Sequence, residues 1–323
     1  MTDLTQRRLF ITVILILLAV FSNSSNALAE DKDYQEGYIT VNADIRLFYQ
    51  KIGNGKEIMI IPAGFFLFED FKHLAQNRTL IFYDMRNRGR SASVSDSSQI
   101  GIDKDVEDLE AVRKHFRVQK ADLLGWSYLG LMVMLYTKSY PHHVNKIIQI
   151  GPVPLKWNEQ FPDSLTHRVP VAQDTMYLTV VEKAHASGMN EKDPAMFSRI
   201  IFELMEKPRL IGNQAKISNI GCQWGDHTKY PNEQYSNLMH HMKIHFEGSI
   251  QNRTYNPEDF RKINKPVLVI HGTWDRNAVF GAGKQWAALM PRARLLRVHK
   301  AGHIPWVEEP LLVFQSIKNF LSN

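Results

Sequence analysis

The sequence predicts an α/β fold with a mostly parallel central sheet, flanked by helices and interrupted by a mainly helical insertion. Three observations indicate this fold: short apolar runs alternate with helical patterns over residues 30–152, the alternation stops over 153–265, and it returns over 266–323. Repeated strand–helix–strand units imply a parallel sheet with right-handed crossovers. The interruption is rich in Met, His and polar residues and has helical patches near 178–187 and 195–206.

Several apolar runs have the composition of strands that are buried on both faces of a sheet. Ile58–Ile61 lies between Gly55 and Pro62, and Leu80–Tyr83 ends at Asp84. Continuous apolar runs of this length are typical of parallel strands. Further strands are expected over 38–41, 45–50, 121–124, 146–150, 267–270 and 295–298.

Helices are predicted between these strands. Over 103–116 the apolar residues recur at helical spacing, with acidic residues in the first turn and basic residues in the last, which complements the helix dipole. A strongly apolar helix over 129–140 stops before Pro141, because proline cannot continue a helix. The second half adds helices over 282–290 and 310–321.

The N-terminus has the three parts of a secretory signal peptide. Arg7 and Arg8 carry the positive charge, the 13 residues Leu9–Phe21 form an apolar run, and Ala27-Leu28-Ala29 matches a cleavage site. A membrane-spanning helix needs about 20 apolar residues, so this run is short. We expect residues 1–29 to be cleaved and the protein to be secreted or periplasmic, without a stable membrane span; an uncleaved membrane tether is the alternative.

Composition narrows the class of protein. Hydrophobic residues make up 44% and charged residues 22% of the 323 residues, as in an ordinary globular protein. The net charge of +6 comes from scattered rather than clustered residues, which argues against a nucleic-acid partner. Cys222 is the only cysteine, so an internal disulfide cannot form and stability has to come from packing.

Ser127 is the candidate nucleophile. It lies in Gly125-Trp126-Ser127-Tyr128-Leu129-Gly130, between a buried strand and an apolar helix. A sharp turn in this context is a nucleophile elbow, which exposes the hydroxyl at the helix N-terminus, where developing negative charge is stabilised. Leu129 stands where such turns usually have a small residue, so its neighbours must have adapted to it or the turn is less tightly wound.

Asp275 and His303 are the candidate partners of the serine. Each lies in a loop directly after a predicted strand, in His271-Gly272-Thr273-Trp274-Asp275 and in Ala301-Gly302-His303-Ile304-Pro305. Loops at the carboxyl ends of parallel strands converge on one crevice. Serine, aspartate and histidine in this order along the chain predict a nucleophilic triad.

These segments resemble the α/β-hydrolase superfamily over nearly all of residues 30–323, and most of all its capped group that includes proline iminopeptidases and related esterases. Asp84–Ser91 is similar to the family's D-x-R-G-x-G-x-S loop, with Asn87 and Arg88 replacing part of it, and His303 matches the G-H-x-P histidine. The resemblance implies a core over 30–152 and 266–323, a helical cap over 153–265, no cofactor and no metal. It also implies that the Asp84–Arg90 loop braces the sheet edge.

The mechanism that follows is hydrolysis of a small-molecule ester, or an amide, through an acyl-enzyme. The resemblance places two backbone N–H groups around the oxyanion, one from Tyr128 and one from Phe65 in Pro62-Ala63-Gly64-Phe65-Phe66, where the family usually has H-G-x. The missing histidine and the absence of a G-G-P-G run weaken the peptidase assignment.

The sequence leaves other functions open. A proline iminopeptidase-like aminopeptidase would need acidic cap residues, for which Glu203, Glu206 and Asp226 are available. A non-catalytic binding protein on a hydrolase scaffold is the competing class. His241 and His245, four apart, have the spacing of zinc ligands, but a polar helix face is the favoured interpretation. Aromatic and Met side chains that would line the pocket or fill the cap core are Phe197, Phe202, Met205 and Trp224.

Overall fold

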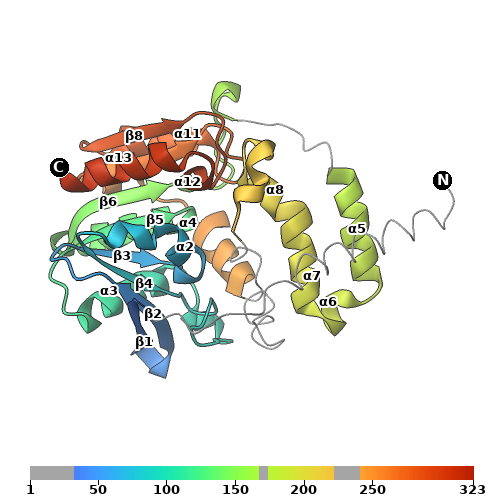
Figure 1. Ribbon diagram of the computed structural model, residues 1–323, viewed down its shortest axis with the longest axis horizontal. Helices are drawn as coiled ribbons and strands as arrows, with labels where there is room; N and C mark the ends of the chain where they lie inside the picture. The colour runs from blue at the N-terminus through green and yellow to red at the C-terminus, as the bar shows by residue number, and fades with distance from the viewer. Residues whose placement is uncertain (1–32, 167–173, 222–240) are drawn as a thin grey trace.

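The computed structural model describes residues 33–166, 174–221 and 241–323 (Figure 1). Its centre is a sheet of eight strands in the order β1-β2-β4-β3-β5-β6-β7-β8. The first pairings, β1 with β2 and β2 with β4, are antiparallel, and every later pairing is parallel. The strands are β1 (Tyr34–Thr40), β2 (Arg46–Ile52), β3 (Ile58–Pro62), β4 (Thr79–Tyr83), β5 (Ala121–Trp126), β6 (Val144–Ile150), β7 (Val267–Gly272) and β8 (Ala293–Val298). The predicted mostly parallel α/β fold is confirmed.

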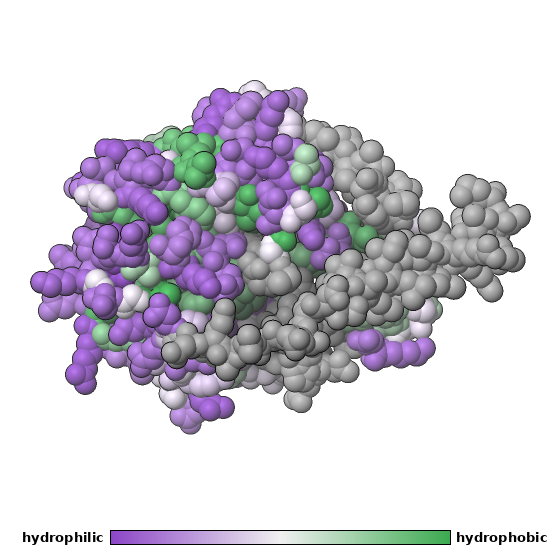
Figure 2. All heavy atoms as spheres, viewed as in Figure 1, coloured by the Kyte–Doolittle hydropathy of each residue, from purple (hydrophilic) through white to green (hydrophobic). Residues whose placement is uncertain are grey.

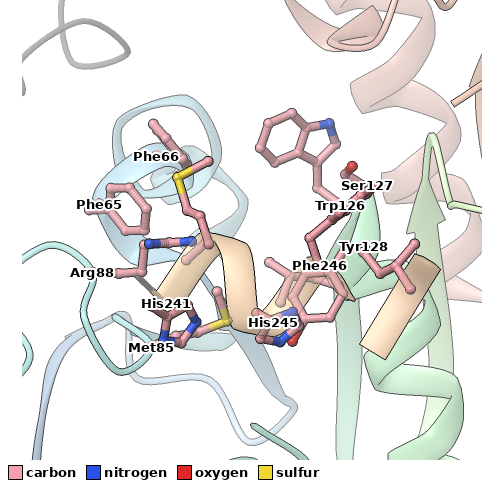
Figure 3. Close-up of a pocket in the computed structure, with 14 residues that line it drawn as sticks. Phe65, Phe66, Met85, Arg88, Trp126, Ser127, Tyr128, His241, His245 and Phe246 are labelled. Atoms are coloured by element: carbon pink, nitrogen blue, oxygen red, sulfur yellow. The ribbon is translucent and has the colours of Figure 1, made fainter. Parts of the chain in front are cut away.

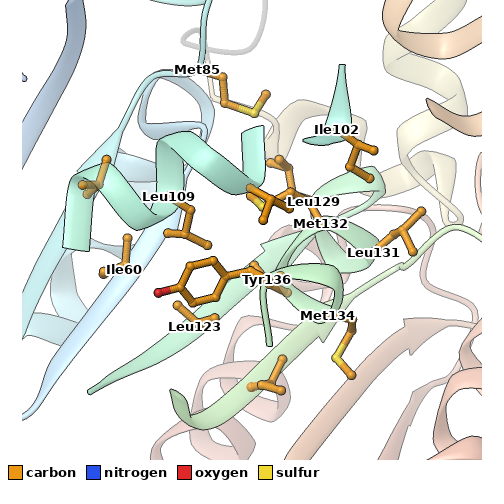
Figure 4. Close-up of a cluster of buried hydrophobic side chains, with 14 of the residues drawn as sticks. Ile60, Met85, Ile102, Leu109, Leu123, Leu129, Leu131, Met132, Met134 and Tyr136 are labelled. Carbon is orange, nitrogen blue, oxygen red and sulfur yellow. The ribbon is translucent and has the colours of Figure 1, made fainter. Parts of the chain in front are cut away.

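Helices cover both faces of the sheet and create two apolar layers. Alternate residues of one strand serve the two layers: Ile60 packs with one cluster, whereas Met59 and Ile61 pack with the other. One layer contains α3 (Ile102–His115), α4 (Tyr128–Ser139) and α11 (Phe280–Leu289), and Figure 4 shows its side chains between helix and sheet. The other contains α2 (Gly64–Phe71), α12 (Pro305–Glu308) and α13 (Pro310–Ser322).

Between β6 and β7 the elements that the structure describes are helical. They form the cap, which lies beside the carboxyl ends of the parallel strands (Figure 1). Its α-helices are α5 (Asp174–Ala186), α6 (Met189–Lys192), α7 (Pro194–Ile201) and α8 (Lys207–Leu210), with a helical segment at 241–246. The last helix before β7, α10 (Pro257–Arg261), packs instead against α4 and α11 of the core. Over the described residues, no helix has the length and apolar character needed to cross a membrane.

The loop after β4 braces the antiparallel edge of the sheet, as the resemblance implied. The Asp84 N–H donates to the carbonyl oxygen of Phe48 at 2.9 Å, and the Ser91 hydroxyl donates to the Asp84 carbonyl oxygen at 2.6 Å. The Phe48 N–H donates in turn to Ser91 Oγ at 2.8 Å. These bonds join the loop to β2, so Asp84 has a fixed position at the end of β4. Residues 1–32, which include the predicted signal peptide, lie outside the described residues.

Candidate active site

Ser127 lies in a strained turn between β5 and α4. Its φ of 57° and ψ of −127° are unusual for a residue with a side chain. The turn brings the backbone of Leu129 so close to Gly125 that a Cβ at Gly125 would lie 2.2 Å from the Leu129 carbonyl oxygen. Only glycine fits there. Leu129 itself is buried in the apolar core, 3% exposed, so the neighbours accommodate its side chain while the turn stays tight.

Asp275 and His303 form a buried pair at the carboxyl ends of β7 and β8. His303 Nδ1 lies 2.7 Å from Asp275 Oδ2. The other carboxylate oxygen, Oδ1, accepts hydrogen bonds from the N–H groups of Asn277 and Ala278, each at 2.9 Å. Burial by itself would raise the pKa of Asp275, but the adjacent His303 and the hydrogen bonds from His271 and His303 hold it well below its usual range. The carboxylate is therefore ionised and oriented toward the imidazole.

His271 is a member of this cluster that the sequence did not reveal. Its Nε2 lies 3.2 Å from Asp275 Oδ2 and 2.6 Å from the Ala278 carbonyl oxygen, which makes Nε2 the protonated nitrogen. The ring is fully buried, and its Nδ1 has no hydrogen-bond partner in the described part of the chain. The only signal in the sequence is its place at the end of a predicted strand, four residues before Asp275.

Backbone contacts bring Ser127 to the Asp275–His303 pair. The Ser127 N–H donates to the Ile150 carbonyl oxygen at 2.8 Å, and the next residue, Gly151, is so close to the pair that a Cβ there would lie 3.0 Å from His303 Nδ1. Trp126 Nε1 donates to the His303 carbonyl oxygen at 2.9 Å. Within the described ranges no hydrogen bond joins the Ser127 hydroxyl to His303. The three predicted residues thus converge on one place, with the serine hydroxyl still unbonded to the imidazole.

The two backbone N–H groups that were predicted to bind the oxyanion differ in whether they already make a hydrogen bond. The Tyr128 N–H is the first of α4 and makes no hydrogen bond among the residues described, as the geometry of a helix N-terminus allows. The Phe65 N–H donates instead to Asp84 Oδ1 at 2.8 Å, so its assignment as an oxyanion donor is wrong for this geometry. Pro62–Phe66 is not an open loop, because α2 begins at Gly64 after the left-handed residue Ala63 (φ 66°). The Gly64 N–H, one position earlier, makes no bond in the described part and is the better candidate.

Asp84, which occupies the Phe65 N–H, is itself an unusual carboxyl group. It is buried, and burial raises its pKa to about 6 although the Arg90 and Phe65 N–H groups both donate to it. The Arg90 N–H lies 2.8 Å from Oδ2. This carboxyl joins the start of α2 to the loop after β4, and both segments contribute residues to the lining of the pocket in front of Ser127.

A cavity of about 300 Å³ opens in front of Ser127 (Figure 3). Its walls are mainly apolar and aromatic, and among the described residues that line it there is no carboxylate. Ser127 lies at one end of the cavity, and Arg88 and His241 lie at the other (Figure 3). The apolar lining residues are Ala63, Phe65, Phe66, Met85, Trp126, Leu129, Met242, Phe246 and Ile250; the others are Arg88, Ser127, Tyr128, His241 and His245.

A buried hydrogen-bond network links the cap to the elbow. Asp105 on α3 accepts a hydrogen bond from the Tyr128 hydroxyl, and its Oδ2 lies 2.7 Å from His245 Nε2. Burial alone would raise the pKa of Asp105, but the hydrogen bond and charge of His245 lower it. The rings of His241 and His245 stack at 5.3 Å, and Asn87 Nδ2 donates to His241 Nδ1 at 3.2 Å.

The favoured interpretation of the two histidines as a polar helix face is therefore wrong, because both are buried in the pocket wall, 1% and 5% exposed. Burial and the nearby Arg88 lower the pKa of His241 to about 3, so its imidazole is neutral. In the described ranges no group of three His, Cys, Asp or Glu side chains is placed to hold a metal ion.

Of the acidic cap residues considered for binding an amine, the two that the structure describes do not line the cavity. Glu203 pairs with Lys207 at 3.0 Å, and Glu206 lies on the cap surface. Asp226 and Trp224 lie outside the described residues, as does the side chain of Met205. Phe202 is buried in the apolar layer of α2 and α13, so it packs with the core of the protein and does not line the cavity.

Comparison with known proteins identifies the fold. A family model described as "alpha/beta hydrolase fold" matches residues 61–188, which include the elbow. Bromoperoxidase from Bacillus anthracis superposes with a TM-score of 0.66 at 17% identity, over 90% of this chain and 100% of that one. A 2-hydroxy-6-oxo-6-phenylhexa-2,4-dienoate hydrolase from Rhodococcus sp. strain RHA1 gives a TM-score of 0.65 at 15% identity, over 90% and 99%. The chain has the α/β-hydrolase fold.

Among proteins with curated names, the chain is similar in sequence to proline iminopeptidases. It is 24% identical to a proline iminopeptidase from Heyndrickxia coagulans over 313 residues, which cover 90% of this chain and 99% of the relative. A proline iminopeptidase from Clostridium botulinum is 21% identical over 84% of this chain and 92% of the relative. The resemblance to this capped group is confirmed.

Proposed function

We propose that the protein is a serine hydrolase that cleaves small esters through an acyl-enzyme. The observation that carries the proposal is the position of Ser127, which lies in a strained elbow beside the Asp275–His303 pair and at the end of an apolar cavity. Strained backbone of this kind is typical of catalytic nucleophiles. A cavity of about 300 Å³ with apolar walls suits a short acyl group.

In the proposed reaction, His303 takes the proton of the Ser127 hydroxyl while Oγ attacks the ester carbonyl carbon. Asp275 holds Nδ1 of His303 protonated, which leaves Nε2 free to accept this proton. The oxyanion of the tetrahedral intermediate is stabilised by the N–H groups of Tyr128 and Gly64. His303 then returns the proton to the leaving alkoxide, and water hydrolyses the acyl-serine by the same steps.

A second candidate function is release of N-terminal residues, favoured by the likeness to proline iminopeptidases. An aminopeptidase of this kind has to bind a free ammonium group, for which a carboxylate is the natural partner. The described lining of the cavity supplies Arg88 and two histidines instead. For this reason we place ester hydrolysis first.

The test is activity on p-nitrophenyl acetate and butyrate and on proline p-nitroanilide, measured for the natural chain and for Ser127→Ala. Ser139→Ala, at the exposed far end of the same helix, is the matched control. We expect ester cleavage that Ser127→Ala abolishes and Ser139→Ala leaves intact. Preference for the anilide would support the aminopeptidase, and tight binding of esters without turnover would support a non-catalytic binding protein. Activity that survives Ser127→Ala would refute the proposed nucleophile.

We also propose, from the sequence, that residues 1–29 direct export and are then removed. The mass of the purified protein from a secreting host tests this, because cleavage gives a chain that begins at Glu30. An intact N-terminus in the membrane fraction would show the alternative, a membrane tether.

A further inference from the structure

Basic residues lie one or two positions before the start of four adjacent parallel strands. Lys120 precedes β5, His143 precedes β6, Lys265 and Pro266 precede β7, and Arg292 precedes β8. β5 and β6 start side by side, as do β7 and β8, whereas β7 starts beside Ile147, three residues (about 10 Å) along β6. All four strands therefore begin at the same end of the sheet. This edge faces away from the cap (Figure 1), on a side where Figure 2 shows mostly hydrophilic residues.

A surface hollow of about 450 Å³ adjoins the start of β5 and β6. Of the eight described residues that line it, six are basic and none is acidic. Arg113 is neutralised by Glu110, since its guanidinium lies 2.7 Å from that carboxylate. The other basic residues in the lining are Lys114, Arg117, Lys120, His142 and His143.

Two cations of this lining, Arg117 and Lys120, have no ion-pair partner among the described residues, and neither have Lys265 and Arg292 at the starts of β7 and β8. We call these four residues the basic edge. The carboxylates nearby on α10 are already occupied, because Asp259 pairs with Lys138 at 2.6 Å and Glu258 pairs with Arg261. Helix dipoles account for basic residues in the last turn of α3, but not for residues that lie beyond the helix ends.

Like charges on the basic edge repel one another. The pKa of Lys265 is lowered, first by partial burial and then by the charges of Lys120 and Arg292. Such an arrangement costs free energy in the isolated protein, and an anionic partner that covers the edge would remove this cost.

We propose that the basic edge docks the protein on a membrane surface that contains anionic phospholipid. A nucleic acid fits less well, because the hollow offers no Phe, Tyr or Trp for base stacking. The expected export also brings the chain to a membrane, since Leu9–Phe21 has to enter or cross one. Because the cavity at Ser127 opens at the carboxyl ends of the strands, a protein docked by their amino ends would receive its substrate from solution.

Co-sedimentation of the full chain with vesicles tests the proposal. Vesicles of pure phosphatidylcholine give the baseline binding, which includes any insertion of the N-terminal segment. Vesicles with about 30% phosphatidylglycerol carry a negative surface potential, so the additional binding to them measures the electrostatic contribution. A patch variant and a control variant each lose four positive charges. The patch variant carries Arg117→Gln, Lys120→Gln, Lys265→Gln and Arg292→Gln; the control carries Lys192→Gln, Lys243→Gln, Lys284→Gln and Lys300→Gln, all at exposed positions.

We expect tighter binding to the anionic vesicles than to the neutral ones, weakened by added salt. Each basic residue near an anionic surface contributes about fivefold to the partition coefficient, so the patch variant should lose more than about a hundredfold. The control should lose far less, and ester hydrolysis in solution should be the same in both variants. Equal losses in both variants, no preference for anionic vesicles, or binding to a short DNA duplex in place of vesicles would each overturn the proposal.

Discussion

Replacing Asp275 with Asn tests the proposed triad at its least exposed member. The Asn side-chain oxygen can still accept the Asn277 and Ala278 N–H groups, so its amide nitrogen will point to His303 Nδ1, where the carboxylate Oδ2 lies 2.7 Å away in the natural chain. An amide N–H next to Nδ1 forces the imidazole to carry its proton on Nε2. That nitrogen can then no longer accept the Ser127 proton.

The expected loss in kcat is about 10⁴-fold, which corresponds to about 5 kcal/mol in activation free energy. The assay is p-nitrophenyl ester hydrolysis, with the melting temperature measured beside it. Asp108→Asn is the matched control, because Asp108 is equally buried but accepts both of its hydrogen bonds from Arg86, at 2.7 Å each. That variant should lose stability, by about 3–5 kcal/mol for a broken buried ion pair, and keep its kcat. A loss of kcat below about tenfold in Asp275→Asn, in a protein that melts normally, would refute the role given to Asp275.

Three further outcomes are expected. Gly151→Ala and Gly188→Ala both place a side chain at positive φ, at a cost of about 1–2 kcal/mol in stability. Only Gly151→Ala should also lower kcat, by at least about tenfold, because its Cβ would press on His303 and Asp275, whereas the Cβ at Gly188 would meet the flexible Lys192. Equal kcat values in the two variants would contradict this. The pKa of Asp84 is about 6 in the folded protein, above its value in the unfolded chain. The stability that Asp84 contributes is therefore present below about pH 4 and is lost as the pH rises through 6, a decrease of about 3 kcal/mol in the free energy of unfolding. Urea unfolding of the natural chain should show this pH dependence and that of Asp84→Asn should not, so parallel curves for the two proteins would contradict the prediction. Tyr128→Phe removes the buried hydrogen bond to Asp105 and should lower the free energy of unfolding by about 1–3 kcal/mol. The value of kcat should be retained, because the proposed oxyanion donor is the backbone N–H of Tyr128. A large fall in kcat would show that the hydroxyl itself takes part in the reaction.

Local patterns in the sequence were sufficient for the architecture and for the three candidate catalytic residues. Strand and helix periodicity depends on neighbours a few residues apart, and a serine between a buried strand and an apolar helix is recognisable from that context alone. The loops of Asp275 and His303 follow strands whose parallel order brings them to one edge of the sheet. These features therefore needed no knowledge of distant contacts.

Distant contacts decided the rest. The sequence predicts the Phe65 N–H to bind an oxyanion, but in the structure Asp84, 19 residues away, accepts its hydrogen bond. His241 and His245 lie in the pocket wall, where they form hydrogen bonds with Asn87 and Asp105. These two partners come more than a hundred residues earlier in the chain, from a loop and a helix. A hydrogen bond between such residues leaves no periodic trace in the sequence.

The same reason explains the charge distribution. Along the chain the basic residues are scattered, and their number gives only a net charge of +6. The strand order β5-β6-β7-β8 places Lys120, Lys265 and Arg292 on one edge of the molecule. Residue identity and local periodicity belong to the sequence itself, whereas the grouping of charges and the partner of each polar group are properties of the folded sheet, because folding alone sets which distant residues are neighbours.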